Sequence, residues 1–281
     1  MGRRITVSPT LPDTQRKIVG KENGLSNLSI AVIIAAAGAL VTAFVMTSPI
    51  PQDPAYHRFA DTRTLLAVSN FWNVASNLPF LLVGLWGFVF VRWHGVSVCI
   101  PGLQVAYLVF FAGVFLTAFG SGYYHLDPAN EPLIWDRLPM TIGFAGLFSI
   151  IIGEFISART GRRILVPLLV IGIASVVYWA YSESRGAGDL RPYAIVQFLP
   201  LLLIPFILLV KRPAIGSVKY YWLMILFYVL AKVFEHFDAE IFSFGQVLGG
   251  HTIKHLFAAL TPATMLYALT LRRNRDGPAN A

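Results

Sequence analysis

Hydrophobic residues are concentrated in eight long runs that short polar segments separate. Each run has about 20 residues, which is enough for an α-helix to cross the hydrocarbon core of a bilayer. Because the runs are continuous, they do not resemble the short alternating segments of a membrane β-barrel. The pattern predicts an all-α integral membrane protein with eight spans, at residues 28–48, 72–92, 102–120, 139–157, 163–182, 192–210, 219–237 and 252–271.

The composition supports this class of protein. Of the 281 residues, 56% are hydrophobic and 13% are charged, whereas soluble domains carry about 25% charged residues. The mean hydropathy is +0.65. The single cysteine, Cys99, excludes an internal disulfide.

The net charge of +8 is distributed unevenly along the chain. If the N-terminus is cytoplasmic, fifteen of the 22 Lys and Arg residues fall in cytoplasmic segments. This is the positive-inside pattern, so both termini are predicted to be cytoplasmic. The basic charge therefore indicates topology and contact with anionic membrane lipids, not nucleic-acid binding. The opposite segments hold only five basic residues, Arg58, Arg63, Arg137, Arg185 and Arg191.

Three polar segments share the outer face in this topology. They are residues 53–77, residues 120–139 ("GSGYYHLDPANEPLIWDRLP") and residues 235–255. The second and third segments contain four of the six histidines and six of the 14 Asp and Glu residues. Because these segments come from separate parts of the chain, their convergence indicates a functional site.

Three of these histidines have the spacing of metal ligands. His251 and His255 are four residues apart, so on a helix they lie on one face. Taken alone, they could also be interfacial histidines at a helix start. His125 is expected at the same depth, and three histidines with an open fourth position are typical of a catalytic zinc site. The sequence therefore predicts a metal site at His125, His251 and His255.

Ser121 and Asp136 are candidates to complete this site. Ser121 precedes His125 by four residues, so its hydroxyl is expected on the same side of the helix. It could instead bond a backbone carbonyl at the helix end. Asp136 could lie at a helix N-terminus ahead of Pro139, or pair with Arg137.

Other ionisable residues in the apolar runs are expected to have structural roles. Glu154 is predicted to pair with an arginine. Lys232 and Glu235 are three residues apart and are predicted to neutralise each other. Lys254 is predicted to extend towards the membrane interface.

These motifs resemble the signature of the alkaline ceramidases. The matching residues are Ser121-x-x-x-His125, Asp136 eleven residues later, and a late His251-x-x-x-His255. This family belongs to the CREST superfamily of seven-span membrane hydrolases. The three motifs occur in the family's order, which makes the combination more specific than each motif alone.

The resemblance implies a division of the chain. "FWNVASN", residues 71–77, is similar to the start of the first family span. Residues 53–272 would form a seven-span ceramidase-like catalytic domain. Residues 28–48 would add an extra N-terminal transmembrane helix, and residues 1–27 and 273–281 would be cytoplasmic tails.

The resemblance also implies a reaction. The expected activity is hydrolysis of the N-acyl bond of a ceramide-like lipid to a fatty acid and a free amine. By the family pattern, His125, His251 and His255 would bind Zn²⁺. Asp136 would carry the proton of the attacking water, and the Ser121 hydroxyl would stabilise the oxyanion.

One feature departs from the family. Eukaryotic members carry an acidic cluster, associated with calcium, before the first family span. Here Asn70 directly precedes "FWN", and upstream Asp61 lies among Tyr56, His57 and Arg58. Calcium prefers several oxygen ligands, usually with carboxylates among them. A calcium site is therefore not expected.

The residues leave other functions open. A related lipid esterase or phospholipase could use the same site, and a membrane receptor could keep it for structure. A cation transporter is less favoured, because the ionisable groups gather at one face and not at the midplane. The compact loops suit a bacterial inner membrane with the site on the periplasmic side, although an endoplasmic-reticulum protein would obey the same charge rule. The sequence does not indicate an oligomeric state.

Overall fold

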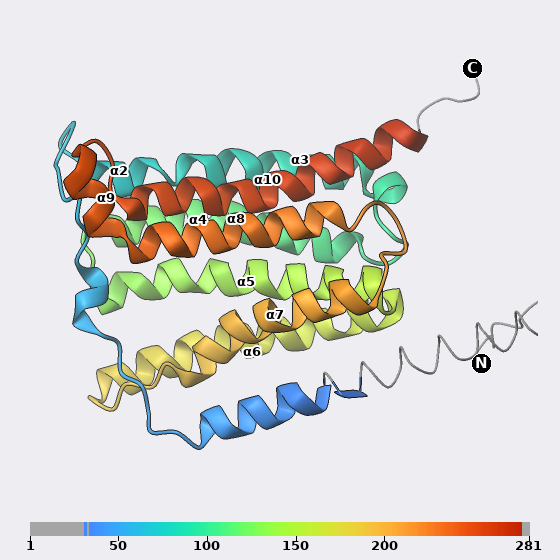
Figure 1. The fold of residues 1–281 in the computed structure, drawn as a ribbon, viewed down its shortest axis with the longest axis horizontal. Helices are drawn as coiled ribbons and strands as arrows, with labels where there is room; N and C mark the ends of the chain where they lie inside the picture. The colour runs from blue at the N-terminus through green and yellow to red at the C-terminus, as the bar shows by residue number, and fades with distance from the viewer. Residues whose placement is uncertain (1–30, 33, 277–281) are drawn as a thin grey trace, which may run out of the picture.

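The computed structural model describes residues 31–32 and 34–276 (Figure 1). In these residues the secondary structure is helical, apart from one isolated β-bridge between Leu65 and Val68. The elements are η1 (Pro54–His57), α2 (Phe71–Ala75), α3 (Leu78–Val98), α4 (Gln104–Leu126), α5 (Asn130–Phe155), α6 (Ala158–Ser184), α7 (Arg191–Val210), α8 (Lys219–His236), α9 (Asp238–Gly245) and α10 (Gly250–Asp276).

The predicted all-helical class is confirmed. Five helical segments are long and apolar enough to cross a membrane: α2 with α3, then α4, α5, α6 and α7. Helix α8 carries three charged residues, Lys219, Lys232 and Glu235, and α10 begins with polar residues. The count of eight spans and the orientation remain predictions.

The first predicted span is described only in part. Within the predicted span 28–48, the described residues include the helical segment Ile34–Val45, and residues 28–30 and 33 lie outside the described ones, as does the predicted tail 1–27. Arg191 at the start of α7 donates a hydrogen bond to the Val45 carbonyl at 2.8 Å. This contact ties the end of the N-terminal helix to the bundle.

The boundary between α4 and α5 is shorter than the sequence pattern predicts. Helix α4 continues to Leu126 and α5 begins at Asn130, so only residues 127–129 connect them. The apolar runs end earlier because polar side chains in these turns are buried against other helices. At the other end of the chain, α10 continues to Asp276, into the predicted tail.

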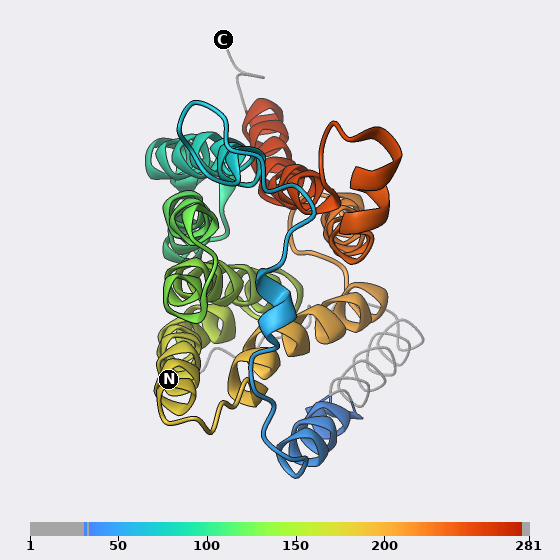
Figure 2. The ribbon, with the colours of Figure 1, turned by 90° about the vertical axis from the view of Figure 1, so that its left-hand side faces the viewer.

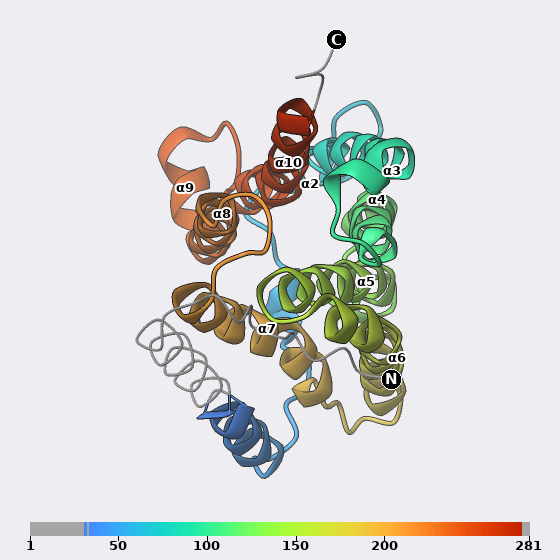
Figure 3. The same ribbon diagram turned by 90° about the vertical axis from the view of Figure 1, so that its right-hand side faces the viewer.

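Several helices contribute residues to the lining of one cavity, namely α3, α4, α5, α7, α8 and α10. Helices α3, α4, α5 and α6 pack in sequence order, α10 packs against α3 and α8, and α7 lies against α5 and α6 (Figures 2 and 3). Large apolar side chains stay exposed on α3, α6 and α7, where Trp86, Val166 and Leu209 are 66%, 63% and 72% exposed. Such exposure suits a lipid environment.

Close packing of α4 against α5 depends on small residues. A Cβ atom added to Gly113 would lie 2.4 Å from the backbone nitrogen of Gly143. Small residues allow helices in membranes to approach closely in this way. The polar segments 53–77, 120–139 and 235–255 then meet at one end of the bundle, the left end in Figure 1, as predicted.

Candidate metal centre and lipid cavity

The three predicted histidines form a buried cluster. His125 lies in the last turn of α4, and His251 and His255 lie in the first turns of α10. Their exposed fractions are 1%, 5% and 4%. The candidate ligand atoms all lie within 4.8 Å of one another, and each pair of rings has centroids 4.9 Å apart. The cluster could hold a metal ion.

The start of α10 is fixed by neighbouring helices. A Cβ atom on Gly250 would lie 2.2 Å from the Phe234 carbonyl oxygen of α8, so this position favours glycine. The carboxylate of Asp238 accepts hydrogen bonds at 2.8 Å from the backbone N–H groups of His251 and Ala60. A carboxylate at a helix N-terminus is electrostatically favourable. These contacts set the positions of both α10 histidines.

Hydrogen bonds assign the protonation of His255. The Ser76 hydroxyl donates to the Asn73 carbonyl at 3.1 Å and lies 2.8 Å from His255 Nδ1. With its own proton committed, the hydroxyl accepts from Nδ1–H. In a neutral imidazole the other nitrogen, Nε2, then carries a lone pair. A hydrogen bond of this kind commonly orients a metal-binding histidine.

The other two histidines have nitrogens without protein partners. Nδ1 of His125 and Nε2 of His251 are buried and make no hydrogen bond with any described residue. Buried polar atoms are nearly always paired, so these two atoms indicate a missing ligand. The donor set therefore fits a metal ion bound by three imidazoles.

Phe59 covers the cluster from the loop side. Its ring centroid lies 4.8 Å from that of His125 and 4.4 Å from that of His251. The adjoining loop is held by Arg63, which pairs with Asp61 at 2.6 Å and donates to the Val247 carbonyl at 2.7 Å. The hydrogen bonds from Arg63 lower the pKa of the Asp61 carboxyl.

The carboxylates in the segment before α2 have hydrogen-bond partners within that segment. Asp61 binds Arg63, and Asp53 accepts a hydrogen bond from the Ala55 N–H at 2.8 Å. Asn70 donates at 2.9 Å to the His125 carbonyl. Asn70 thus supports the histidine cluster from the position just before "FWN".

Gly120 brings Ser121 and Asp136 to the same cavity. A Cβ atom on Gly120 would lie 1.9 Å from the Trp135 carbonyl oxygen, so α4 and α5 are in close contact here. Ser121 and Asp136, each one residue further along, are both buried and line one cavity with His255. Thr117 and Thr141 donate to backbone carbonyls of their own helices, whereas no such bond is found for Ser121 among the described residues, in contrast to the alternative considered from the sequence.

Two interpretations of Asp136 are wrong. Helix α5 begins at Asn130, so Asp136 lies inside the helix and not at its N-terminus, and Pro139 is also internal. Arg137 does not pair with Asp136. Its Nη2 donates to Gln52 Oε1 at 2.5 Å instead. The polar residues before Pro139 had suggested a loop, but they face partners within the bundle.

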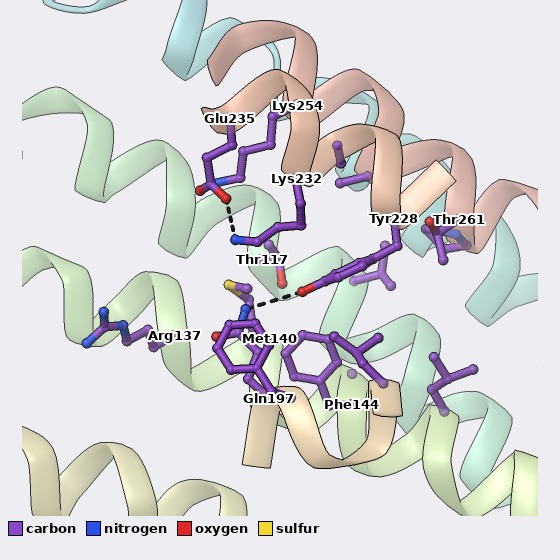
Figure 4. Close-up of a pocket in the computed structure, with 18 of the residues that line it drawn as sticks. Thr117, Arg137, Met140, Phe144, Gln197, Tyr228, Lys232, Glu235, Lys254 and Thr261 are labelled. Atoms are coloured by element: carbon purple, nitrogen blue, oxygen red, sulfur yellow. Dashed lines mark hydrogen bonds and ion pairs between the residues drawn. The ribbon is translucent and has the colours of Figure 1, made fainter. Parts of the chain in front are cut away.

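The cavity has a volume of about 470 Å³ and extends from this site between the helices (Figure 4). Its polar end holds Ser121, Asp136 and His255. Apolar residues such as Phe144 and Ile151 line the remainder. Asp136 and Ile151 are fifteen residues apart on α5, which corresponds to about 22 Å along the helix.

The expected ion pairs are present, with one difference. Glu154 binds Arg272 of α10 at 2.6 Å, and Lys232 pairs with Glu235. Lys254 does not extend to the interface as predicted. It lies at the cavity and pairs with Glu235 at 2.6 Å. The half-buried Glu235 carboxylate thus holds the ammonium group at the cavity.

Sequence reasoning missed several residues around the site. Ser76 and Asn73 lie in "FWNVASN", where polar residues three apart in an apolar run could have indicated a buried polar face. Phe59 and Asp238 lie outside the long apolar runs. No local pattern connects them with the histidines.

The fold and site thus define an all-helical protein, compatible with a membrane, that has a candidate three-histidine metal centre at one end of an apolar cavity. Neither family models nor characterised proteins give a match to this sequence. The likeness to the alkaline ceramidases therefore rests on the motifs alone.

Proposed function

We propose that the protein is a zinc-dependent membrane amidase of the alkaline ceramidase type. It hydrolyses the N-acyl bond of a ceramide-like lipid and releases a fatty acid and a free amine. One observation carries the proposal: buried His125 and His251, each with an unpartnered nitrogen, cluster with His255, and His255 lines the polar end of an apolar cavity together with Ser121 and Asp136. A metal-activated water and an acyl chain would both have a place there.

The donor set favours zinc. His125, His251 and His255 offer imidazole nitrogens, which suit zinc among the common metal ions. Three protein ligands leave a fourth position open, as in catalytic zinc sites. Zinc bound there would lower the pKa of a coordinated water to about 7 and so supply a nucleophile at neutral pH.

Asp136 and Ser121 supply the remaining chemistry. The Asp136 carboxylate accepts the proton of the attacking water and then delivers it to the leaving amine nitrogen. The Ser121 hydroxyl donates a hydrogen bond to the oxygen that becomes negatively charged when the carbonyl carbon turns tetrahedral. Their burial excludes bulk water and strengthens both interactions.

The cavity suits a lipid chain. Pockets for small ligands commonly have volumes of about 300–1,000 Å³ and mostly apolar walls. The cavity here lies within this range. With the amide beside His255, the acyl chain extends towards Ile151.

The proposal includes a location. The distribution of Lys and Arg residues supports cytoplasmic termini and a site on the outer side. The compact connections suit a bacterial inner membrane, with the reacting amide near the periplasmic surface.

The test combines zinc analysis with a hydrolysis assay. Detergent-purified wild type is expected to hold about one zinc per chain and to release fatty acid from N-acyl lipids. His251→Ala should lose most of its zinc. Asp136→Asn should keep zinc and lose hydrolysis, whereas Asp127→Asn, a matched change in the exposed α4–α5 connection, should keep both.

The outcomes separate the candidate functions. A folded wild type that takes up no zinc when zinc is supplied would refute the mechanism. Zinc binding without hydrolysis of amide or ester lipids would favour a receptor that keeps the site for structure. Cleavage of esters but not amides would favour a lipid esterase.

A further inference from the structure

A cluster of three charged side chains lines the cavity beside the candidate metal centre. Glu235 of α8 binds the ammonium groups of both Lys254 and Lys232, with a distance of 2.6 Å to Lys254 (Figure 4). Lys254 directly precedes His255 in α10. One carboxylate therefore bridges two cations close to the histidines.

The cavity lining carries an excess of positive charge. Among the described residues, its cationic side chains are Arg137, Lys232 and Lys254, and its acidic side chains are Asp136 and Glu235. Three cationic against two acidic side chains leave the lining with a formal net charge of +1. A buried uncompensated charge is unfavourable, so this end of the cavity is suited to a monoanion.

No acidic side chain among the described residues neutralises Arg137. It is 5% exposed and has no carboxylate partner within the described chain. Its guanidinium lies over the rings of Trp179 and Tyr193, 4.1 and 4.7 Å from their centroids, and bonds the neutral side chain of Gln52. Cation–π contacts stabilise this charge but do not neutralise it.

Lys232 is the cation that a ligand can reach most easily. Its side chain is 39% exposed, compared with 19% for Lys254. In Figure 4 its ammonium group points into the cavity, towards Thr117 and Met140. An ammonium group has three donors, and Glu235 is its one acceptor among the described residues.

We propose that the lipid substrate carries an anionic group, a carboxylate or a phosphate, close to its scissile amide, and that Lys232 binds this group. The inference rests on the amidase function proposed above. Because the cluster adjoins His255, the anion has to lie near the amide. An N-acyl amino acid has this arrangement, with its carboxylate one carbon from the amide nitrogen, whereas a neutral ceramide offers no anion.

The reaction balances without a further reactant. Water adds its oxygen to the acyl carbon, the carbon–nitrogen bond breaks, and the proton goes to the nitrogen. The products are a fatty acid and a free amino acid. Lys232 determines specificity in this scheme and takes no part in bond breaking.

The experiment compares matched lipids in uncharged detergent micelles. N-palmitoylglycine and N-palmitoylethanolamine have the same two-carbon headgroup, which ends in a carboxylate in the first and a hydroxyl in the second. Phosphorylated ceramide and ceramide form the second pair, which tests recognition of a phosphate. Wild type is expected to favour the anionic lipid of at least one pair by tenfold or more in kcat/KM. The preferred pair identifies the anion as carboxylate or phosphate. Equal or better hydrolysis of both neutral lipids would overturn the proposal.

Variants connect the preference to Lys232. In Lys232→Gln the ratio of anionic to neutral kcat/KM should fall to near one, and in Lys232→Arg it should persist. The Gln variant is expected to fold, because Glu235 keeps Lys254 as its partner. Lys219→Gln, at the other end of the same helix, is the matched control and should leave the ratio unchanged. An unchanged ratio in Lys232→Gln would also overturn the proposal.

Binding separates this inference from the amidase function. Asp136→Asn protein should bind N-palmitoylglycine at least tenfold more tightly than N-palmitoylethanolamine, or phosphorylated ceramide more tightly than ceramide. If no lipid is hydrolysed but this difference is measured, the amidase proposal fails and anion recognition stands. Equal binding within both pairs would refute anion recognition even in an active enzyme.

Discussion

Replacing Gly120 by alanine tests how the α4–α5 contact positions the site. The added Cβ would lie 1.9 Å from the Trp135 carbonyl oxygen, 2.8 Å from the Trp135 carbonyl carbon and 3.2 Å from Pro139 Cγ. Proline at position 139 has no N–H, so the Trp135 carbonyl lacks its usual partner one turn later and faces α4 instead. Backbone atoms in a helix cannot rotate away as a side chain does.

The required movement can be estimated. Ordinary van der Waals contact begins near 3.4 Å, so the two helices have to separate locally by about 1.5 Å. Overpacking of this kind typically costs about 1–3 kcal/mol. Ser121 and Asp136 directly follow the two residues in contact and move with them. A displacement of about 1 Å at a reacting group can lower the rate about 100-fold.

Gly122→Ala provides the control, because a Cβ atom on Gly122 meets nothing within 4 Å. Both substitutions remove a helical glycine from α4, so both gain about 1 kcal/mol in helix propensity. The difference between their free energies of unfolding in detergent, about 1–3 kcal/mol, then isolates the overpacking. Gly120→Ala should also show about 100-fold lower kcat/KM on the preferred amide lipid. Equal stability and activity within threefold of the control would refute the close contact as the positioning feature.

Three further predictions concern the supports of the site and the bundle. Ser76→Ala should weaken zinc affinity about 10- to 100-fold, because the proposed ligand His255 loses its orienting hydrogen bond. Competition with a chelator measures the affinity, and an unchanged value would contradict the assigned bond. Arg272→Met should destabilise the protein by about 3–5 kcal/mol in denaturant unfolding, because Glu154 stays buried without its partner; the double variant with Glu154→Gln should be less destabilised. Hydrogen bonds from Arg191 lower the pKa of Asp189 to about 2, below its usual 3.8. Wild type should therefore have a higher melting temperature than Asp189→Asn at neutral pH, and the difference should shrink as the pH falls from 3.8 towards 2. A difference that stays constant over this pH range would contradict the ion pair.

Local chemistry made part of the site predictable. The spacing of His251 and His255 requires only that the segment be helical, since residues four apart then share a face. His125 follows from the alternation of spans, which returns the end of α4 to the same side of the bundle as the start of α10. The pairing of Lys232 with Glu235 is equally local.

Other features depend on distant contacts and could not be read from periodicity. Lys254 turns to the cavity because Glu235, nineteen residues earlier, lies there half-buried and accepts its hydrogen bond. Phe59 reaches the histidines only through the path of the segment that joins η1 to α2. Helix α5 begins before the apolar run because buried partners, not hydropathy, determine the polar turns around Asp136.

Helix α10 contacts neighbouring helices at both ends through different kinds of side chain. His251 and His255 contact His125 of α4 at one end of α10. Arg272 pairs with Glu154 of α5 at the other end, about 26 Å from His255 by the helical rise. The histidine cluster and the Arg272–Glu154 ion pair share no residue, so either contact can break while the other remains. If the histidine cluster holds a metal, we expect its removal to loosen the loops around His251 and to leave the Arg272–Glu154 contact intact, so that metal can bind again without refolding.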